Sequence, residues 1–111
     1  MIKTVEAQRK YFQSGATLSY AFRVKQLKTL YQAIKKNEDL IMEALQRDLG
    51  KSFFESYATE LFMVYGEIKH TLKHLKSWMK DERVPTPVQS LGGKSYLHRQ
   101  PLGVVLIMAP W

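Results

Sequence analysis

The sequence predicts a mostly α-helical chain that ends in two β-strands and that belongs to the α/β class. Three observations indicate this. Residues 1–83 carry apolar side chains at helical spacing and contain no proline. Residues 84–93 then hold two prolines and two glycines. Residues 103–109 are an uninterrupted apolar run, which is typical of strands that helices cover on both faces of a parallel sheet.

Gly15 separates the first two of four expected helices. The first helix should cover residues 4–13 and end before this glycine. The second should cover residues 18–36, because its apolar side chains recur every three or four positions and so form one helical face. This apolar stripe comprises Tyr20, Val24, Leu27, Tyr31 and Ile34.

The third expected helix has a signal at each end. Asn37 suits an N-cap, and acidic residues follow it in the first turn. Gly50 suits a helix stop. The third helix is therefore expected over residues 38–49.

The fourth expected helix is the longest and covers residues 53–80. Ser52 and Glu55 have the spacing of a capping box at its start. A wide apolar surface predicts that this helix packs on more than one partner. Its main stripe comprises Leu61, Tyr65, Ile68, Leu72, Leu75 and Met79, and a second line comprises Phe54, Ala58 and Phe62.

Residues 84–93 predict a loop, since proline removes backbone donors and restricts the residue before it. Residues 94–100 alternate in polarity and predict an exposed strand. Residues 103–111 predict a second, central strand after a tight turn. This last run is uncharged, whereas natural C-termini are usually polar. It therefore predicts that the chain is the front piece of a larger protein.

Composition limits the classes of function. The chain has no cysteine, which excludes disulfides, cysteine-bound metal and a thiol nucleophile within these residues. It has no secretory signal and no run of about 18 apolar residues that could be a transmembrane segment. We therefore expect a cytoplasmic protein.

The net charge of +7 favours an alternative function. Residues 1–50 carry nine Lys and Arg against five Asp and Glu, and residues 51–111 carry eight against five. A free-standing basic helical module could bind an acidic partner or nucleic acid. Such a module should gather its basic residues on one face, whereas these are spread along the chain, so we expect no nucleic acid partner. The apolar stripe of the longest helix leaves open a third possibility, a helix pair that serves as a dimerisation element.

Several short motifs suggest chemistry but lack a required residue. Two Gly-Lys-Ser triplets start at Gly50 and Gly93, but neither has the upstream glycine of a phosphate loop. His70 and His74 have a metal-ligand spacing, yet they lack the glutamate of zinc proteases and lie among lysines, so we expect no metal site.

Two acidic residues of the longest helix also invite a catalytic interpretation. Glu60 and Glu67 share a helix face but lie about 10 Å apart at the α-helical rise. We therefore expect these carboxylates to form salt bridges.

The last twelve residues, QPLGVVLIMAPW, resemble the segment of aldehyde dehydrogenases that leads into their Pro-Trp-Asn motif. The resemblance extends to the class 3 branch of that family, which acts on fatty and aromatic aldehydes, and covers residues 18–111. Its further elements are Asp48-Leu49-Gly50-Lys51-Ser52, Glu55-Ser56-Tyr57, Thr59-Glu60-Leu61, Glu67-Ile68-Lys69, Leu75-Lys76-Ser77-Trp78 and Val84.

This resemblance implies a Rossmann-like fold in the full protein and the NAD- or NADP-dependent oxidation of aldehydes to carboxylic acids. In the family a cysteine attacks the aldehyde, a glutamate activates water, and the asparagine after Pro-Trp helps to hold the oxyanion. None of these three catalytic residues is present here, so we expect this piece alone to be inactive.

The resemblance also implies roles for particular parts of this chain. The cofactor-binding residues should be Met108, Ala109, Pro110 and Trp111. Residues 1–83 should flank the cofactor domain, residues 94–100 should join a sheet that links subunits, and residues 103–111 should be the first strand of the dinucleotide-binding domain. The partners implied are an aldehyde substrate and a second copy in a homodimer.

Overall fold

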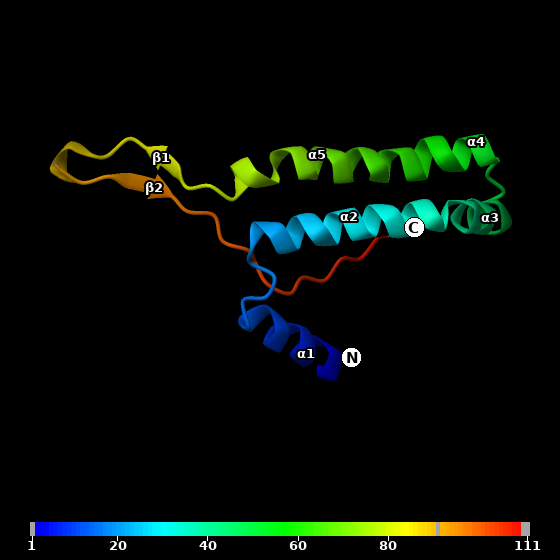
Figure 1. The fold of residues 1–111 in the computed structure, drawn as a ribbon, viewed down its shortest axis with the longest axis horizontal. Coiled ribbons are helices and arrows are strands. Elements are labelled where there is room, and N and C mark those ends of the chain that lie inside the picture. The colour runs from blue at the N-terminus through cyan, green and yellow to red at the C-terminus, as the bar shows by residue number, and fades with distance from the viewer. Residues whose placement is uncertain (1, 91, 110–111) are drawn as a thin grey trace. The chain divides into compact units, whose positions relative to one another are not determined.

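The longest helical run spans residues 53–78 and provides most of the buried core (Figure 1). It consists of α4 (Phe53–Ser56), the π-helical segment η1 (Tyr57–Leu61) and α5 (Phe62–Trp78). The structure is a computed structural model and describes residues 2–90 and 92–109. The predicted main stripe is confirmed as core, since its best-buried members are only 3–8% exposed. These are Leu61, Tyr65, Ile68 and Leu75.

The π-helical segment explains why the sequence shows two apolar lines at the start of this helix. A π-turn holds an extra residue and rotates the positions that follow it. Leu61 is buried at its end, whereas Phe54 and Phe62 are 83% and 62% exposed. Both phenylalanines of the second line are therefore exposed, while Ala58 is half-buried, and the core follows the main stripe.

The described residues divide into two units. One unit is Arg23–Leu75, which holds most of α2 (Tyr20–Lys36), α3 (Glu38–Leu49), α4, η1 and most of α5. Among the described residues, the other unit holds 2–22, 76–90 and 92–109. It contains α1 (Ile2–Gln13) and a β-hairpin. A mostly helical chain with two strands in its C-terminal part confirms the predicted fold class.

The Gly50 stop and the Ser52 cap were predicted, whereas the cap at the start of α2, where the Ser19 hydroxyl accepts from the Phe22 N–H at 3.2 Å, was not. Gly50 has the left-handed conformation, with φ of 67°, and its N–H donates to the Gln46 carbonyl. The Ser52 hydroxyl accepts a hydrogen bond from the Glu55 N–H at 3.2 Å, as a capping box requires. Asn37 lies at the predicted N-cap position of α3, where its carbonyl accepts from the Ile41 N–H at 3.0 Å. Its side-chain amide donates backwards to the Ala33 carbonyl at 2.7 Å and makes no N-cap bond, so it closes the end of α2.

Within Arg23–Leu75, helices α2 and α5 pack through two tyrosine rings. The Tyr31 and Tyr65 centroids lie 4.9 Å apart with a tilted geometry. Tilted and offset aromatic pairs are favourable beyond the area that they bury. The two helices run in opposite directions, as the colour gradient in Figure 1 shows.

The Tyr65 hydroxyl extends this packing to α3. It donates to Glu38 Oε2 at 2.9 Å, and the Lys35 ammonium donates to the same oxygen at 2.8 Å. Hydrogen bonds from Lys35 and Tyr65 hold the pKa of Glu38 below its usual range. Burial, together with the bond to this anion, raises the pKa of Tyr65 to about 12.

The β-hairpin pairs β1 (Glu82–Val84) with β2 (Ser95–Leu97) in antiparallel register, with Arg83 opposite Tyr96. β2 lies inside the predicted strand at residues 94–100. The strand β1 was not predicted, because three residues before a proline-rich loop are too few for a period-two pattern. The loop between the strands contains the short 3₁₀ turn η2 (Val88–Ser90).

The second predicted strand, over residues 103–111, is not observed among its described residues. Residues 103–109 form no helix or strand, and Pro110 and Trp111 lie outside the described residues. A strand is defined by backbone hydrogen bonds to a neighbour. Within the residues that the structure describes, the one two-stranded sheet is the hairpin, so this apolar run has no partner to pair with.

Replacing Tyr65 by Phe should destabilise the protein by about 1–2 kcal/mol, because it removes a hydrogen bond to an ionised carboxylate. Urea unfolding monitored by circular dichroism measures this. Tyr57→Phe is the matched control, since Tyr57 is 37% exposed and its side-chain hydroxyl donates no hydrogen bond in the described part of the chain. Equal midpoints for the two variants would contradict the assignment.

Stability should also fall in alkaline solution. Since the folded-state pKa of Tyr65 lies near 12 and above its ordinary value of 10, its contribution is complete below pH 10 and is lost as pH rises toward 12. The unfolding free energies of the wild type and of Tyr65→Phe should converge over this interval. A difference that stays constant from pH 9 to pH 12 would show that the hydroxyl is not bonded to an anion.

Candidate functional site

The predicted cofactor-binding residues follow an extended and uncovered segment. Met108 is 83% exposed and Ala109 is also exposed. Pro110 and Trp111 lie outside the described residues. Leu106 and Ile107, just before them, are more than 80% exposed. Five consecutive apolar side chains from Val104 onward therefore remain available for contact with other parts of a protein or with a ligand.

Gly103 sets the path of the chain into this segment. Its φ is 94°, in the region that favours glycine, as expected for the end of the predicted tight turn. A Cβ atom here would lie 3.5 Å from the Phe12 ring, which is ordinary van der Waals contact. The backbone conformation, more than space, therefore requires glycine.

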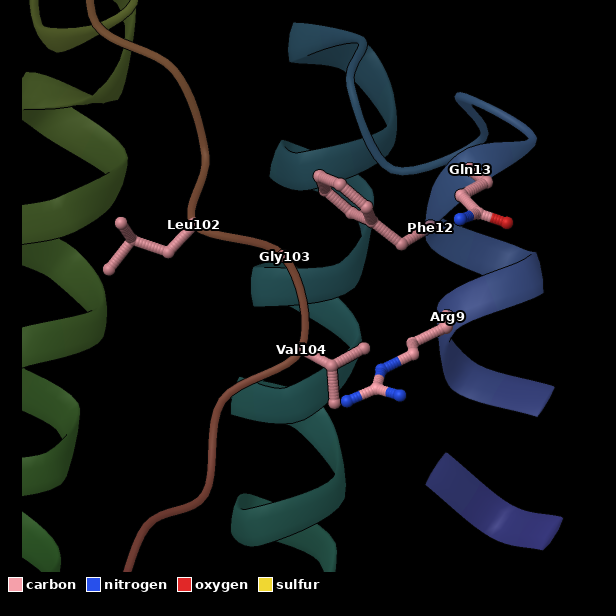
Figure 2. A pocket seen from close by; sticks show the side chains of 6 residues that line it. All are labelled: Arg9, Phe12, Gln13, Leu102, Gly103 and Val104. Carbon is pink, nitrogen blue, oxygen red and sulfur yellow. The ribbon is translucent and has the colours of Figure 1, made fainter. Parts of the chain in front are cut away.

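Phe12 and Gly103 line a pocket of about 300 Å³ (Figure 2). Figure 2 shows the Phe12 ring directed towards Gly103 and the Arg9 guanidinium directed towards Val104. The lining has no nucleophile and no general base, so we interpret the pocket as the seam between α1 and the turn. The lining residues are Arg9, Phe12, Gln13, Leu102, Gly103 and Val104.

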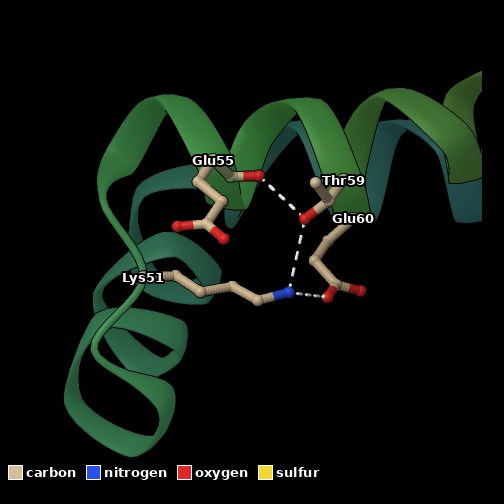
Figure 3. A network of polar contacts seen from close by, with 4 residues as sticks. All are labelled: Lys51, Glu55, Thr59 and Glu60. Carbon is tan, nitrogen blue, oxygen red and sulfur yellow. Dashed lines mark hydrogen bonds and ion pairs between the residues drawn. The ribbon is translucent and has the colours of Figure 1, made fainter.

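The first Gly-Lys-Ser triplet is structural. Figure 3 shows the Lys51 ammonium directed at Thr59 and Glu60. Lys51 forms an ion pair with Glu60 and donates to Thr59 Oγ1 at 3.3 Å. The Thr59 hydroxyl in turn donates to the Glu55 carbonyl at 2.8 Å. The network ties the loop after α3 to the π-helical segment, and Glu60 makes the salt bridge that was predicted for it.

The second triplet begins the hairpin's return strand. Gly93 donates its N–H to the Ser90 carbonyl at 2.9 Å, and Ser95 N–H donates to Thr86 Oγ1 at 3.1 Å. These bonds close the loop upon itself. Its amides are therefore used by the loop and do not form a phosphate cradle.

His70 and His74 stack with ring centroids 4.2 Å apart. The His74 Nδ1 lies 2.9 Å from the His70 carbonyl oxygen. Because a carbonyl oxygen only accepts, His74 Nδ1 is the donor in this contact. Among the described residues, no group of three or more His, Cys, Asp or Glu side chains could hold a metal ion.

A His–Asp hydrogen bond and an Arg–Glu ion pair close the open end of the hairpin. His98 Nδ1 lies 2.5 Å from Asp81 Oδ1, and Arg99 Nη2 lies 2.6 Å from Glu82 Oε2. All four side chains are about half exposed, so each pair adds little to stability. The pairs do fix the register of the two strands, because they join residues directly beside the ladder.

Sequence reasoning missed Arg9, the Tyr65–Glu38 bond and both side-chain contacts of the hairpin. Each joins residues 17 or more positions apart or lies across a pocket, and helical periodicity carries no such information. The opposite charges near Asp81 and near Arg99 were the one sequence signal that could have indicated the contacts across the hairpin.

The comparisons with known proteins place the chain in a family. The model of the aldehyde dehydrogenase family matches residues 1–111. The chain therefore belongs to the aldehyde dehydrogenase family, as the resemblance in its last twelve residues implied.

Similarity to individual proteins agrees with this family membership. The chain is 43% identical over 103 residues to aldehyde dehydrogenase family 3 comG of Dictyostelium discoideum, which covers 93% of this chain and 22% of that protein. It is 41% identical over 108 residues to the dimeric NADP-preferring aldehyde dehydrogenase of Rattus norvegicus, covering 97% and 24%. The solved substrate-bound state of Staphylococcus aureus AldH is similar with a TM-score of 0.85 and 39% identity, covering 91% and 22%.

The chain thus spans less than a quarter of the length of these relatives. The TM-score of 0.85 shows that the matched residues share their spatial arrangement with that structure. Among the described residues, no helix is long and apolar enough to cross a membrane.

Gly103→Ala should destabilise the protein by about 1–2 kcal/mol, since an L-residue is strained at positive φ. Gly66→Ala is the matched control with the opposite sign. Gly66 lies inside α5 with nothing within 4 Å of an added Cβ, so it should stabilise by about 0.5–1 kcal/mol. Thermal unfolding of both variants measures the direction of each change in stability. The same direction of change in both would show that the turn at Gly103 is not formed.

Proposed function

We propose that the protein carrying this chain oxidises aldehydes to carboxylic acids with NAD or NADP. Membership of the aldehyde dehydrogenase family across residues 1–111 is the observation that carries the proposal. In the reaction an aldehyde and water give a carboxylic acid, and a hydride and a proton leave the substrate. NAD or NADP would supply the hydride acceptor.

In this proposal the chain provides one edge of the cofactor site and none of the reacting groups. Met108 and Ala109 fit that role because both are exposed at the end of an extended segment. Ligands of open α/β sheets bind beside the carboxyl ends of strands, which is where these residues fall if the run is a strand in the whole protein. The small Ala109 side chain would allow a cofactor to approach the backbone. Pro110 and Trp111 complete the proposed edge.

The nucleophile of this reaction must lie elsewhere in the protein, because the chain contains no cysteine. Its helices would therefore act by supporting the cofactor domain. The side-chain contacts that hold the register of the hairpin would keep β2 straight for pairing with a neighbouring sheet. We propose that the protein is a cytoplasmic homodimer and that this hairpin contributes to the contact between subunits. One relative is named as dimeric, which supports the homodimer.

The proposal is tested with the full-length protein by following absorbance of the reduced cofactor. Aliphatic and aromatic aldehydes are each supplied with NAD and then with NADP. Reduction that depends on both aldehyde and enzyme supports the proposal. No reduction of either cofactor with any aldehyde of these two classes would contradict it.

The cofactor edge has its own test. Ala109→Leu should raise the KM for the cofactor at least about tenfold, since one lost or blocked contact is worth a factor of this size. The KM for the aldehyde should change less. Val105→Leu in the same segment is the control and should leave both constants within about twofold. An unchanged cofactor KM in Ala109→Leu would remove this residue from the site.

A further inference from the structure

Lysines line one side of helix α2. The helix contains five Lys and Arg and no acidic residue. Lys28 and Lys35 are seven residues apart, which is close to two helical turns, and Lys25 lies three residues before Lys28. The three ammonium groups therefore occupy one side of the helix over about 15 Å at the α-helical rise.

Helix α5 presents lysines on the same side of the pair. Lys35 follows the packed Tyr31 by four residues, and Lys69 follows the packed Tyr65 by four. Each ammonium lies over the tyrosine ring of the opposite helix, at 6.0 Å for Lys35 and 5.9 Å for Lys69. Antiparallel helices with equivalent contacts are related by a twofold axis perpendicular to the plane of the pair. This axis exchanges the two helices but not the two faces of the pair, so Lys35 and Lys69 lie on the same face. Lys73, four residues after Lys69, continues the row.

These five residues, Lys25, Lys28, Lys35, Lys69 and Lys73, form a surface that we call the lysine face. All five are exposed. One acidic side chain, Glu38, touches it and neutralises Lys35. In the part of the chain that the structure describes, Lys25, Lys28 and Lys73 form no ion pair. The face therefore carries a concentrated positive charge.

The other side of the helix pair exposes apolar side chains. Leu30 directly precedes Tyr31, and Val64 directly precedes Tyr65, so the same twofold relation places both on the side away from the lysines. They are 49% and 42% exposed. Because the chain spans less than a quarter of its relatives' length, we expect the rest of the protein to cover this apolar side. The lysine face would then point outward.

We propose that the lysine face binds an anionic membrane surface. Clusters of about four to eight basic residues on an amphipathic helix are typical of attraction to anionic lipid headgroups. The face holds lysines only, which act as point charges on flexible stems and follow a fluid surface of headgroups. It offers no arginine for paired contacts with a base and no aromatic platform for stacking, which disfavours nucleic acid. This interaction is additional to aldehyde oxidation and does not depend on it.

Sedimentation of the full-length protein with vesicles tests the proposal. Vesicles of phosphatidylcholine are compared with vesicles that also contain about 30% phosphatidylserine, in about 0.1 M NaCl. The wild type should bind the anionic vesicles alone. The triple variant Lys25→Gln, Lys28→Gln, Lys73→Gln should bind at least about tenfold more weakly, and replacement of the same three by Arg should restore binding.

The matched control is Lys3→Gln, Lys10→Gln, Lys94→Gln, which removes the same charge from exposed positions in the other unit. It should keep its affinity within about threefold. Equal losses in both triple variants, no preference of the wild type for anionic vesicles, or tighter binding to a random DNA duplex at the same salt would each overturn the proposal. Thermal unfolding of every variant serves as the control that the substitutions leave folding unchanged.

Discussion

The packing of Tyr31 against Tyr65 is the interaction on which the helical part of this chain depends. It joins α2 to α5 through two rings 4.9 Å apart, and the Tyr65 hydroxyl extends the contact to Glu38 at the start of α3. The buried stripe on α5 has one residue per turn, and each such residue stabilises the fold by about 1.5–3 kcal/mol. Outside this buried stripe, the apolar side chains of Arg23–Leu75 are half-buried or exposed. The polar and ionic contacts of the unit lie around this line and depend on it for their geometry.

The same packing separates the two sides of the helix pair. One residue before each tyrosine is apolar and exposed, and four residues after each tyrosine is a lysine. A single contact thus orients an apolar side and a basic side in opposite directions. Family membership gives the apolar side an explanation, because the relatives are more than four times longer than this chain. The basic side holds none of the proposed cofactor-edge residues, and it carries the proposal of a membrane contact.

The sequence was sufficient for the features that depend on neighbours in the chain. The apolar stripe of α5, the stop at Gly50 and the cap at Ser52 follow from spacing or from backbone conformation. The N-cap position of Asn37 was predicted, but the bond from its side-chain amide to the Ala33 carbonyl at the end of α2 was not. Residues 103–109 have the composition of a buried strand, but a strand forms only against a partner strand.

The lysine face was not predicted, because a count of charges along the chain does not say on which side of a helix each charge lies. That side is known only once the face of α2 that packs on α5 is known. The site residues Met108 and Ala109 came from resemblance, and their role stays a prediction.

Amide hydrogen exchange, resolved by residue, tests the central role of the α2–α5 contact most directly. Amides open at rates that report local stability. The account predicts that, within this chain, the slowest exchange lies at Leu61, Tyr65, Ile68 and Leu75 and in the facing turn of α2 around Tyr31, and that these amides exchange together. Exchange in α5 as fast as in the β-hairpin, or slow exchange in α5 without protection around Tyr31, would contradict it.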